Sequence, residues 1–269
     1  MANTDARYLA RLALILTLSA ATASCGLWLD DEARMQRARD ALENEEYSAA
    51  IIDLKNLLQK TPDDPVARKL LGLALVANGA PEDAEKELRL ALQMGQPLDE
   101  MRVALAEAYV ATGQPDLALE IAEPGLAGDE REMFYLWLYR GDALAQLGRA
   151  ANALRSFEQA AALNIDKATA LVRAAEIYWD SGSLRDALSY AEQAVLEDPD
   201  SIDGRLTLSG IYLDMEEPQS AEETLLGIPV TAQYGPVDQG YVFYYLSEAR
   251  LAQGDPDAAR HALGRVAAL

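Results

Sequence analysis

The fold is decided by residues 134–167, FYLWLYRGDALAQLGRAANALRSFEQAAALNIDK. At Gly148 the first of two helices is predicted to end, because glycine adopts the left-handed conformation that closes a helix without a Cβ clash. Ala153 is the small residue that lets the second helix pack against the first. The stretch therefore predicts a helical hairpin. Its key positions are Trp137, Gly141, Gly148, Ala153, Phe157 and Ala160.

The small residue of the second helix recurs along the chain at a nearly constant spacing. It is found at Ala50, Ala84, Ala118, Ala153, Ala187, Ala221 and Ala259, at successive intervals of 34, 34, 35, 34, 34 and 38 residues. Five residues before most of these alanines stands a helix-closing glycine, at Gly79, Gly113, Gly148, Gly182 and Gly254. Three residues before four of them stands a proline, which is tolerated in a first helical turn: Pro81, Pro115, Pro218 and Pro256.

This 34-residue pattern resembles the tetratricopeptide repeat. The resemblance implies an all-α, right-handed superhelical solenoid of about seven helical hairpins, in which neighbouring hairpins bury each other's apolar faces. Pro124 and Pro229 are expected to cut short the second helices of the third and sixth hairpins. The predicted units span residues 31–64, 65–98, 99–132, 134–167, 168–201, 202–235 and 240–269.

Composition excludes several classes of function. The net charge is −21, from 44 acidic and 23 basic residues, so nucleic acid is not an expected partner. A single Cys and a single His exclude a zinc cluster and a Cys–His catalytic pair. We therefore expect no cofactor, no metal and no catalytic activity. Carboxylates are plentiful, so an acid–base pair of Asp or Glu residues is left open.

The first 24 residues are expected to be a signal peptide. Residues 12–23 form an apolar run that is too short to span a bilayer but suits a signal-peptide core. The following residues resemble a bacterial lipoprotein box, although Thr22 stands where leucine is usual. The resemblance implies a lipid on Cys25, a lipidated linker over residues 25–30 and, from Gly26, sorting to the outer membrane. The alternative is ordinary cleavage after Ala21-Thr22-Ala23, which would release a soluble protein.

A more specific resemblance covers about residues 20–125. The pieces IDLKN (52–56), DDP (63–65) and AEKELR (84–89) are similar to the PEP-CTERM-system tetratricopeptide lipoproteins of Gram-negative bacteria. That family accompanies exosortase and exopolysaccharide genes. The resemblance implies an anchored periplasmic scaffold in exopolysaccharide, biofilm or cell-envelope assembly, in a short relative or one end of a longer design. The alternative is a lipoprotein that supports assembly of a pilus or outer-membrane machine.

Ligands are expected on the first helix of each unit, whose positions 2, 5, 9, 12 and 13 face the groove in this repeat class. Those positions predict an acidic groove with aromatic platforms, suited to a basic protein segment or to a stacked sugar. In the alternative interpretation, the aromatic residues only fill contacts between helices. The expected groove residues are Glu107, Tyr135, Asp142, Glu176, Trp179, Asp180, Tyr241, Tyr244 and Glu248.

The last predicted helix carries an apolar stripe of Leu263, Val266 and Leu269, at spacings of three residues. Exposed apolar surface of this kind often marks an interaction site. We expect it to stack on a second copy in a homodimer or to dock a helix of a partner. The alternative is that this segment frays, as chain termini often do.

Overall fold

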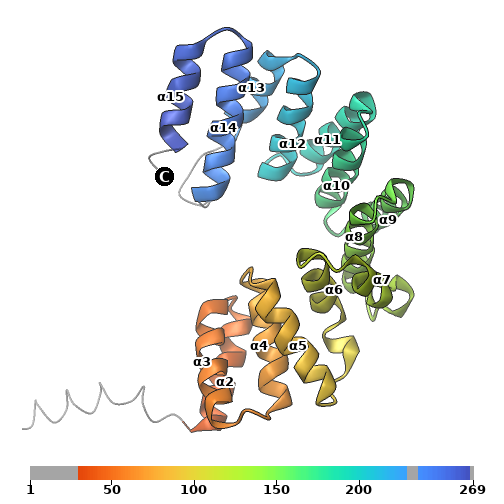
Figure 1. The fold of residues 1–269 in the computed structure, drawn as a ribbon, viewed down its shortest axis with the longest axis vertical. Helices are drawn as coiled ribbons and strands as arrows, with labels where there is room; N and C mark the ends of the chain where they lie inside the picture. The colour runs from red at the N-terminus through yellow and green to blue at the C-terminus, as the bar shows by residue number, and fades with distance from the viewer. Residues whose placement is uncertain (1–29, 229–235, 267–269) are drawn as a thin grey trace, which may run out of the picture. The chain divides into compact units, whose positions relative to one another are not determined.

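The computed structural model describes residues 30–228 and 236–266, and every regular element in these two ranges is helical (Figure 1). The expected all-α fold of about seven hairpins is confirmed, since the described residues form fourteen α-helices. The elements are α2 (Asp31–Glu43), α3 (Tyr47–Lys60), α4 (Pro65–Ala77), α5 (Pro81–Gln93), η1 (Leu98–Glu100), α6 (Arg102–Ala111), α7 (Pro115–Ile121), η2 (Pro124–Leu126), α8 (Glu130–Gln146), α9 (Ala150–Ala162), α10 (Lys167–Asp180), α11 (Leu184–Glu197), α12 (Ile202–Asp214), α13 (Pro218–Leu226), α14 (Pro236–Ala252) and α15 (Pro256–Val266).

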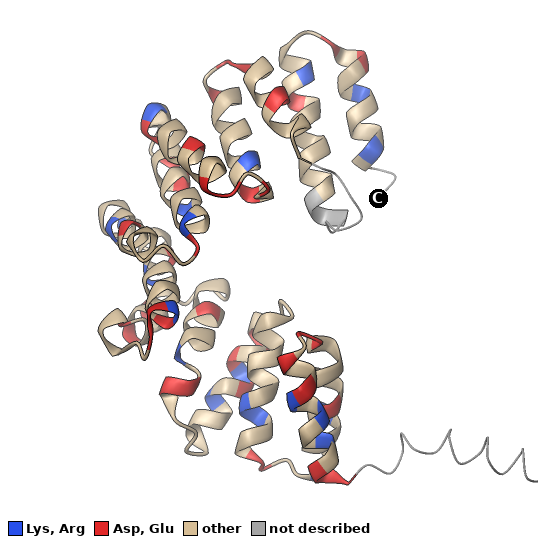
Figure 2. Ribbon diagram, turned by 180° about the vertical axis from the view of Figure 1, so that it is seen from behind, with Lys and Arg blue, Asp and Glu red and all other residues tan. Residues whose placement is uncertain are grey.

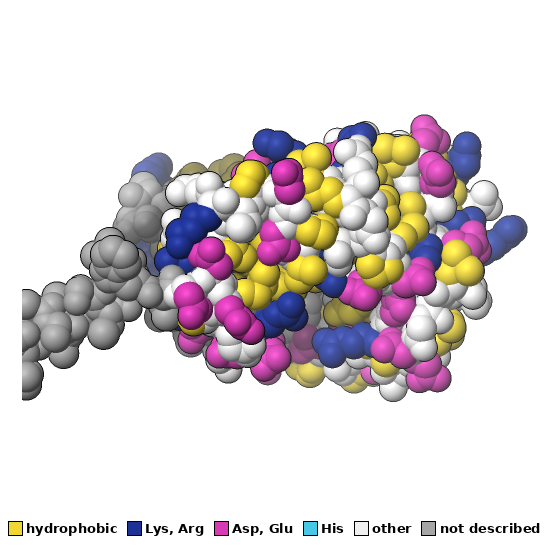
Figure 3. Space-filling model, turned by 90° about the horizontal axis from the view of Figure 1, so that it is seen from below, with side chains coloured by type: hydrophobic (Ala, Val, Ile, Leu, Met, Phe, Trp, Pro, Cys, Tyr) yellow, Lys and Arg dark blue, Asp and Glu magenta, His cyan; other side chains and the backbone are white. Residues whose placement is uncertain are grey.

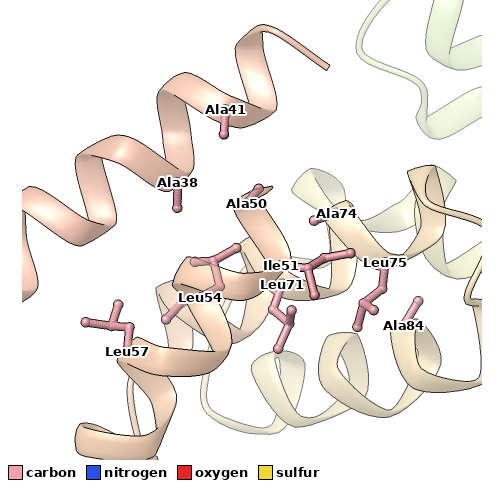
Figure 4. Close-up of a cluster of buried hydrophobic side chains, with 11 residues drawn as sticks. Ala38, Ala41, Ala50, Ile51, Leu54, Leu57, Leu71, Ala74, Leu75 and Ala84 are labelled. Carbon is pink, nitrogen blue, oxygen red and sulfur yellow. The ribbon is translucent and has the colours of Figure 1, made fainter. Parts of the chain in front are cut away.

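The chain divides into two compact units, residues 1–104 and residues 105–269. In the first unit, α2 packs on α3, α3 on α4 and α4 on α5, so that two hairpins stack on each other. Figure 4 shows their shared core, in which alanines of α2 and α4 lie against the larger side chains Ile51, Leu54 and Leu71. The small side chains allow the helices to approach closely enough to exclude water from this core.

A buried carboxylate joins the first two helices. Asp53 of α3 accepts a hydrogen bond of 2.6 Å from Nε of Arg37, and Nη1 of Arg34 lies 3.5 Å from its other oxygen. Both arginines stand on α2. The carboxylate is buried, and these two guanidiniums balance its charge.

The second unit continues the same stacking. The hairpins α8–α9, α10–α11, α12–α13 and α14–α15 each pack internally, and the second helix of each packs on the first helix of the next. As a result, the first helices α10, α12 and α14 contact one another in sequence. This arrangement places side chains from the first helices of three hairpins on a common face.

The residues that define the repeat occupy the places predicted for them. All seven repeating alanines are buried, six of them completely. The five predicted helix-closing glycines have φ between 69° and 82°, which a residue with a Cβ rarely adopts. Each of the four predicted prolines is the first residue of a second helix, at the start of α5, α7, α13 or α15. These predictions are confirmed.

Two first helices begin earlier than the sequence pattern indicated. α8 begins at Glu130, ahead of the predicted unit boundary at residue 134, and α14 begins at Pro236, ahead of residue 240. The cause in α8 is a reciprocal cap. The side chain of Asp129 accepts from the backbone N–H of Glu132, at 2.7 Å, and the Glu132 carboxylate accepts from the N–H of Gly128, at 2.6 Å. Such caps satisfy the free N–H groups of a helix start and extend the helix.

Helix α7 is short, as Pro124 predicted. It ends at Ile121 after seven residues, and a 3₁₀ turn begins at Pro124 itself. The other predicted breaker, Pro229, lies outside the described residues, as do the expected signal peptide, Cys25 and Leu269. Among the helices of the described ranges, none has the length and apolar character needed to cross a bilayer.

Candidate functional site

A pocket of about 440 Å³ opens in the second unit across α10, α12 and α14, the first helices of three consecutive hairpins. We call it the first-helix pocket. Most of its lining comes from the helix positions that the repeat register assigned to ligand binding. Its lining residues are Thr169, Val172, Arg173, Glu176, Trp179, Ser201, Asp203, Leu206, Thr207, Tyr241 and Tyr245.

Trp179 forms one wall of this pocket and is held in place by α12. Its Nε1 donates a hydrogen bond of 2.6 Å to a carboxylate oxygen of Asp214. Its ring lies over Gly210, where an added Cβ would overlap the indole. The packing interpretation of this residue therefore holds, and the ring also lines the pocket. The packing fixes the ring in a defined position, which favours selective binding.

Arg173 interrupts the acidic surface expected along the first helices. Its Nε lies 3.6 Å from a carboxylate oxygen of Asp142 in α8, and its Nη1 donates to Glu176 at 3.2 Å. With Asp203, the pocket lining then contains two carboxylates and one guanidinium. The repeat pattern did not indicate this contact, because Arg173 stands at the sixth position of its unit, outside the groove-facing positions. Basic residues are likewise interspersed among acidic ones along other helices (Figure 2).

Asp142 lies beside the first-helix pocket without lining it. Its side chain is only 17% exposed. Burial raises the pKa of this carboxyl to about 6, and the nearby Arg173 only partly opposes that effect. Asp142, which was expected to face the groove, therefore lies largely buried beside Arg173, with its carboxyl group removed from water.

Glu107 and Tyr135 pack against a residue that the sequence did not single out, Tyr139 of α8. The Tyr139 hydroxyl donates to a carboxylate oxygen of Glu107 at 2.7 Å, and the ring of Tyr135 stacks on that of Tyr139, with centroids 6.2 Å apart. Burial raises the pKa of Glu107, and the hydrogen bond from Tyr139 opposes this rise. These side chains link α6 to α8 on the face of the first helices.

The remaining predicted residues lie at separate places. Tyr241 lines the first-helix pocket and, with Tyr244 and Val266, also an apolar surface on the last hairpin. Leu263 and Val266 are 47% and 36% exposed. Asp180 and Glu248 are exposed and do not line the first-helix pocket. The structure thus brings together three of the predicted groove residues: Glu176, Trp179 and Tyr241.

Sequence reasoning missed several polar residues of the pocket. Thr169 and Asp203 stand at the second position of their units, so the register could have found them. Tyr245 and Thr207 stand at sixth positions, like Arg173, and only the side-by-side placement of α10, α12 and α14 reveals them. Within residues 30–228 and 236–266, no group of His, Cys, Asp or Glu side chains is placed to hold a metal ion.

Two family models described as tetratricopeptide repeat match the chain. One matches residues 35–98 and 103–170, and the other matches residues 179–233. Among curated proteins, none matches the chain in sequence.

Solved structures with the same fold include a human IFIT1 dimer with PPP-AAAA, with a TM-score of 0.67 at 15% identity. That match covers 89% of this chain and 59% of the IFIT1 chain. A tetratricopeptide repeat protein of Parabacteroides merdae has a TM-score of 0.62 at 16% identity, covering 88% of this chain and 92% of its own. PilW, a type IV pilus biogenesis factor, has a TM-score of 0.60 at 17% identity, covering 76% of this chain and 94% of PilW. Since the two models together match more than half of the residues, the chain belongs to the tetratricopeptide-repeat proteins.

Proposed function

We propose that this chain is a non-catalytic scaffold of the cell envelope, and that it captures a basic segment of a partner protein in the first-helix pocket. Tetratricopeptide repeats serve protein–protein interaction. The observation that carries the proposal is the pairing of aromatic walls, Trp179 and Tyr241, with two carboxylates, Glu176 and Asp203, in one pocket.

The chemistry of the lining selects a Lys or Arg side chain. The methylene stem of such a side chain would lie on Trp179 and Tyr241, and its charge would meet Glu176 and Asp203. Arg173 is already engaged with Asp142 and Glu176. The carboxylates beside the pocket thus outnumber its single guanidinium, which disfavours an acidic ligand at this place.

Envelope location is part of the proposal and is supported by the residues around Cys25. We propose that Cys25 carries a lipid and holds the chain on the periplasmic side of the outer membrane of a Gram-negative bacterium. The resemblance of residues 20–125 to the PEP-CTERM-system lipoproteins supports a role in exopolysaccharide or biofilm assembly. A second candidate, support of pilus assembly, is favoured by the fold likeness to PilW, which extends over 94% of that protein.

Binding of a labelled peptide tests the pocket. The probe is a fluorescein-labelled Ala-Lys-Leu-Arg-Ala peptide, compared by fluorescence anisotropy with Ala-Gln-Leu-Gln-Ala on the full chain. We expect the basic peptide to bind more tightly than the amide peptide. The double variant Glu176→Gln/Asp203→Asn should lower the affinity for the basic peptide roughly three- to tenfold, the loss expected when two partly exposed charge contacts are removed.

The matched control is Glu120→Gln/Glu223→Gln, which removes the same charge from exposed positions on the second helices α7 and α13. This control should leave the affinity within about twofold of wild type. An equal loss of affinity in both double variants would mean that general charge attraction, and not the pocket, accounts for binding. Binding of a neutral oligosaccharide but not of the basic peptide would instead assign the pocket to a sugar.

A further inference from the structure

A second pocket, of about 520 Å³, lies in the second unit among α7, α8 and α9. We call it the arginine pocket. Its wall combines an apolar floor with three guanidiniums. The floor is formed by Leu119, Trp137 and Leu144, and the guanidiniums belong to Arg140, Arg149 and Arg155.

The helix α7 beside the arginine pocket is short. Helix α7 has seven residues, whereas the second helices on either side of it along the chain, α5 and α9, have thirteen each. Both α7 and the 3₁₀ turn η2 that follows it contact α8, and Trp137 and Arg140 of α8 line the pocket. Arg140 contacts the C-terminal end of α7, where its Nη1 donates a hydrogen bond of 3.2 Å to the carbonyl oxygen of Ala122.

The charge of this pocket is opposite to that of the chain. The chain has a net charge of −21, yet the pocket lining carries three arginines and a single carboxylate, that of Glu158. Glu158 accepts a hydrogen bond from the hydroxyl of Tyr190 at 3.3 Å, and Glu123 lies 3.7 Å from Arg140. One arginine is therefore partly balanced, and Arg149 and Arg155, both exposed, are left to face a ligand.

The start of α9 adds to the positive potential. Arg149 is the N-cap residue of α9, and the first turn of this helix contains no acidic residue. Because the N-terminal end of a helix carries partial positive charge, this end would be stabilised by a bound anion. By contrast, the second helices α5, α7, α11 and α15 place Asp or Glu in the first turn.

One face of α9 presents hydrogen-bond donors in register. Arg149, Asn152, Arg155 and Gln159 follow each other at intervals of three, three and four residues and all line the pocket. Guanidiniums bind carboxylates with two parallel hydrogen bonds, and side-chain amides can donate to the same oxygens. The apolar floor beside this row would accept an aliphatic or aromatic side chain.

We propose that the arginine pocket binds an acidic peptide segment, with an apolar side chain on Trp137 and flanking carboxylates paired with Arg149 and Arg155. The leucines of the floor favour a peptide over an acidic saccharide, whose hydroxyl groups would lose hydration against Leu119 and Leu144. This site is separate from the first-helix pocket, which lies on α10, α12 and α14. The chain would then hold a basic and an acidic partner segment at the same time.

Anisotropy on the full chain tests this site with fluorescein-labelled Glu-Asp-Leu-Asp-Glu, its amide counterpart Gln-Asn-Leu-Asn-Gln, and oligogalacturonate as a competitor. We expect the acidic peptide alone to bind, with an affinity that falls as salt is raised, because exposed charge pairs are screened. Arg149→Gln/Arg155→Gln should weaken binding about tenfold, the loss expected for two charge-assisted contacts.

The matched control is Arg131→Gln/Arg185→Gln, which removes two exposed arginines that do not line the pocket. It should bind like wild type, and circular dichroism should show all variants equally helical. Equal binding of the acidic and amide peptides, or equal loss in the control, would overturn the proposal. So would binding of oligogalacturonate, measured directly by titration calorimetry, without binding of the acidic peptide, since the ligand would then be a saccharide.

Discussion

The carboxyl group of Asp142 lies largely buried beside Arg173. Its ordinary pKa is 3.8, and burial raises the pKa in the folded chain to about 6. Between these values the folded chain binds this proton more tightly than the unfolded chain. The contribution of Asp142 to stability therefore falls as the pH rises from about 4 to about 6, and the loss is complete at higher pH.

We predict that Asp142→Asn raises the free energy of unfolding at pH 7.5 by about 1–2 kcal/mol, because desolvation of the carboxylate outweighs its attraction to Arg173. The gain should disappear at pH 4, where the wild-type carboxyl group is protonated. Urea unfolding at several pH values measures this. Asp180→Asn, at an exposed position of α10, is the control and should change stability little. A destabilised Asp142→Asn at pH 7.5 would mean that the ion pair dominates.

At the scale of single elements, the start of α8 depends on a few side-chain caps. Asp129 accepts from the N–H of Glu132, and Glu132 accepts from the N–H of Gly128. This reciprocal arrangement lets α8 begin at Glu130 and run for 17 residues. Further along, α8 carries Tyr139, which contacts Glu107, and Trp137 of the arginine pocket.

We predict that Asp129→Ala lowers the free energy of unfolding by about 1 kcal/mol, because the N–H group of Glu132 in the first turn loses its side-chain acceptor. Hydrogen exchange should show faster exchange confined to residues 130–133. Asp129→Asn keeps a cap-forming oxygen and should recover most of the stability. If Asp129→Asn is as unstable as Asp129→Ala, the charge near the helix start, and not the cap, is responsible.

At the scale of the whole molecule, attachment to the membrane is predicted to depend on Cys25. Cys25→Ala should move the protein from the membrane pellet to the soluble periplasmic fraction, because several acyl chains bind a bilayer far more tightly than one. Fractionation followed by immunoblotting at high salt measures this. Retention of the variant in the pellet would refute lipid attachment at this residue, and release of the wild type would favour cleavage after Ala23.

Self-association is predicted through the last hairpin, where Tyr241, Tyr244, Leu263 and Val266 are all exposed. Burying such a surface between two copies would stabilise a symmetric dimer. Sedimentation of wild type from micromolar to tens of micromolar should show a rising mass, and Leu263→Glu/Val266→Glu should remain monomeric. Monomeric wild type over that range would exclude a dimer through this face.

The hairpin fold and its register follow from the pattern of residues along the chain. Alanines such as Ala153 must be small because two helices touch there, and glycine suits position 148 because its φ of 69° is one that residues with a Cβ adopt less readily. Such requirements are local or separated by a fixed helical period, so they are visible in the chain. The same register predicted three pocket residues, Glu176, Trp179 and Tyr241.

The contacts between side chains of different hairpins depend instead on how the helices pack. Arg173 pairs with Asp142 from another repeat, and Trp179 rests on Gly210 and bonds to Asp214 from the next one. The gathering of Arg140, Arg149 and Arg155 also depends on packing, that of α8 on α9. On the face shown in Figure 3, acidic, basic and apolar side chains are intermingled. Net charge and periodicity do not specify such neighbours, because the packing of separate helices sets the distances that decide whether charges pair or repel.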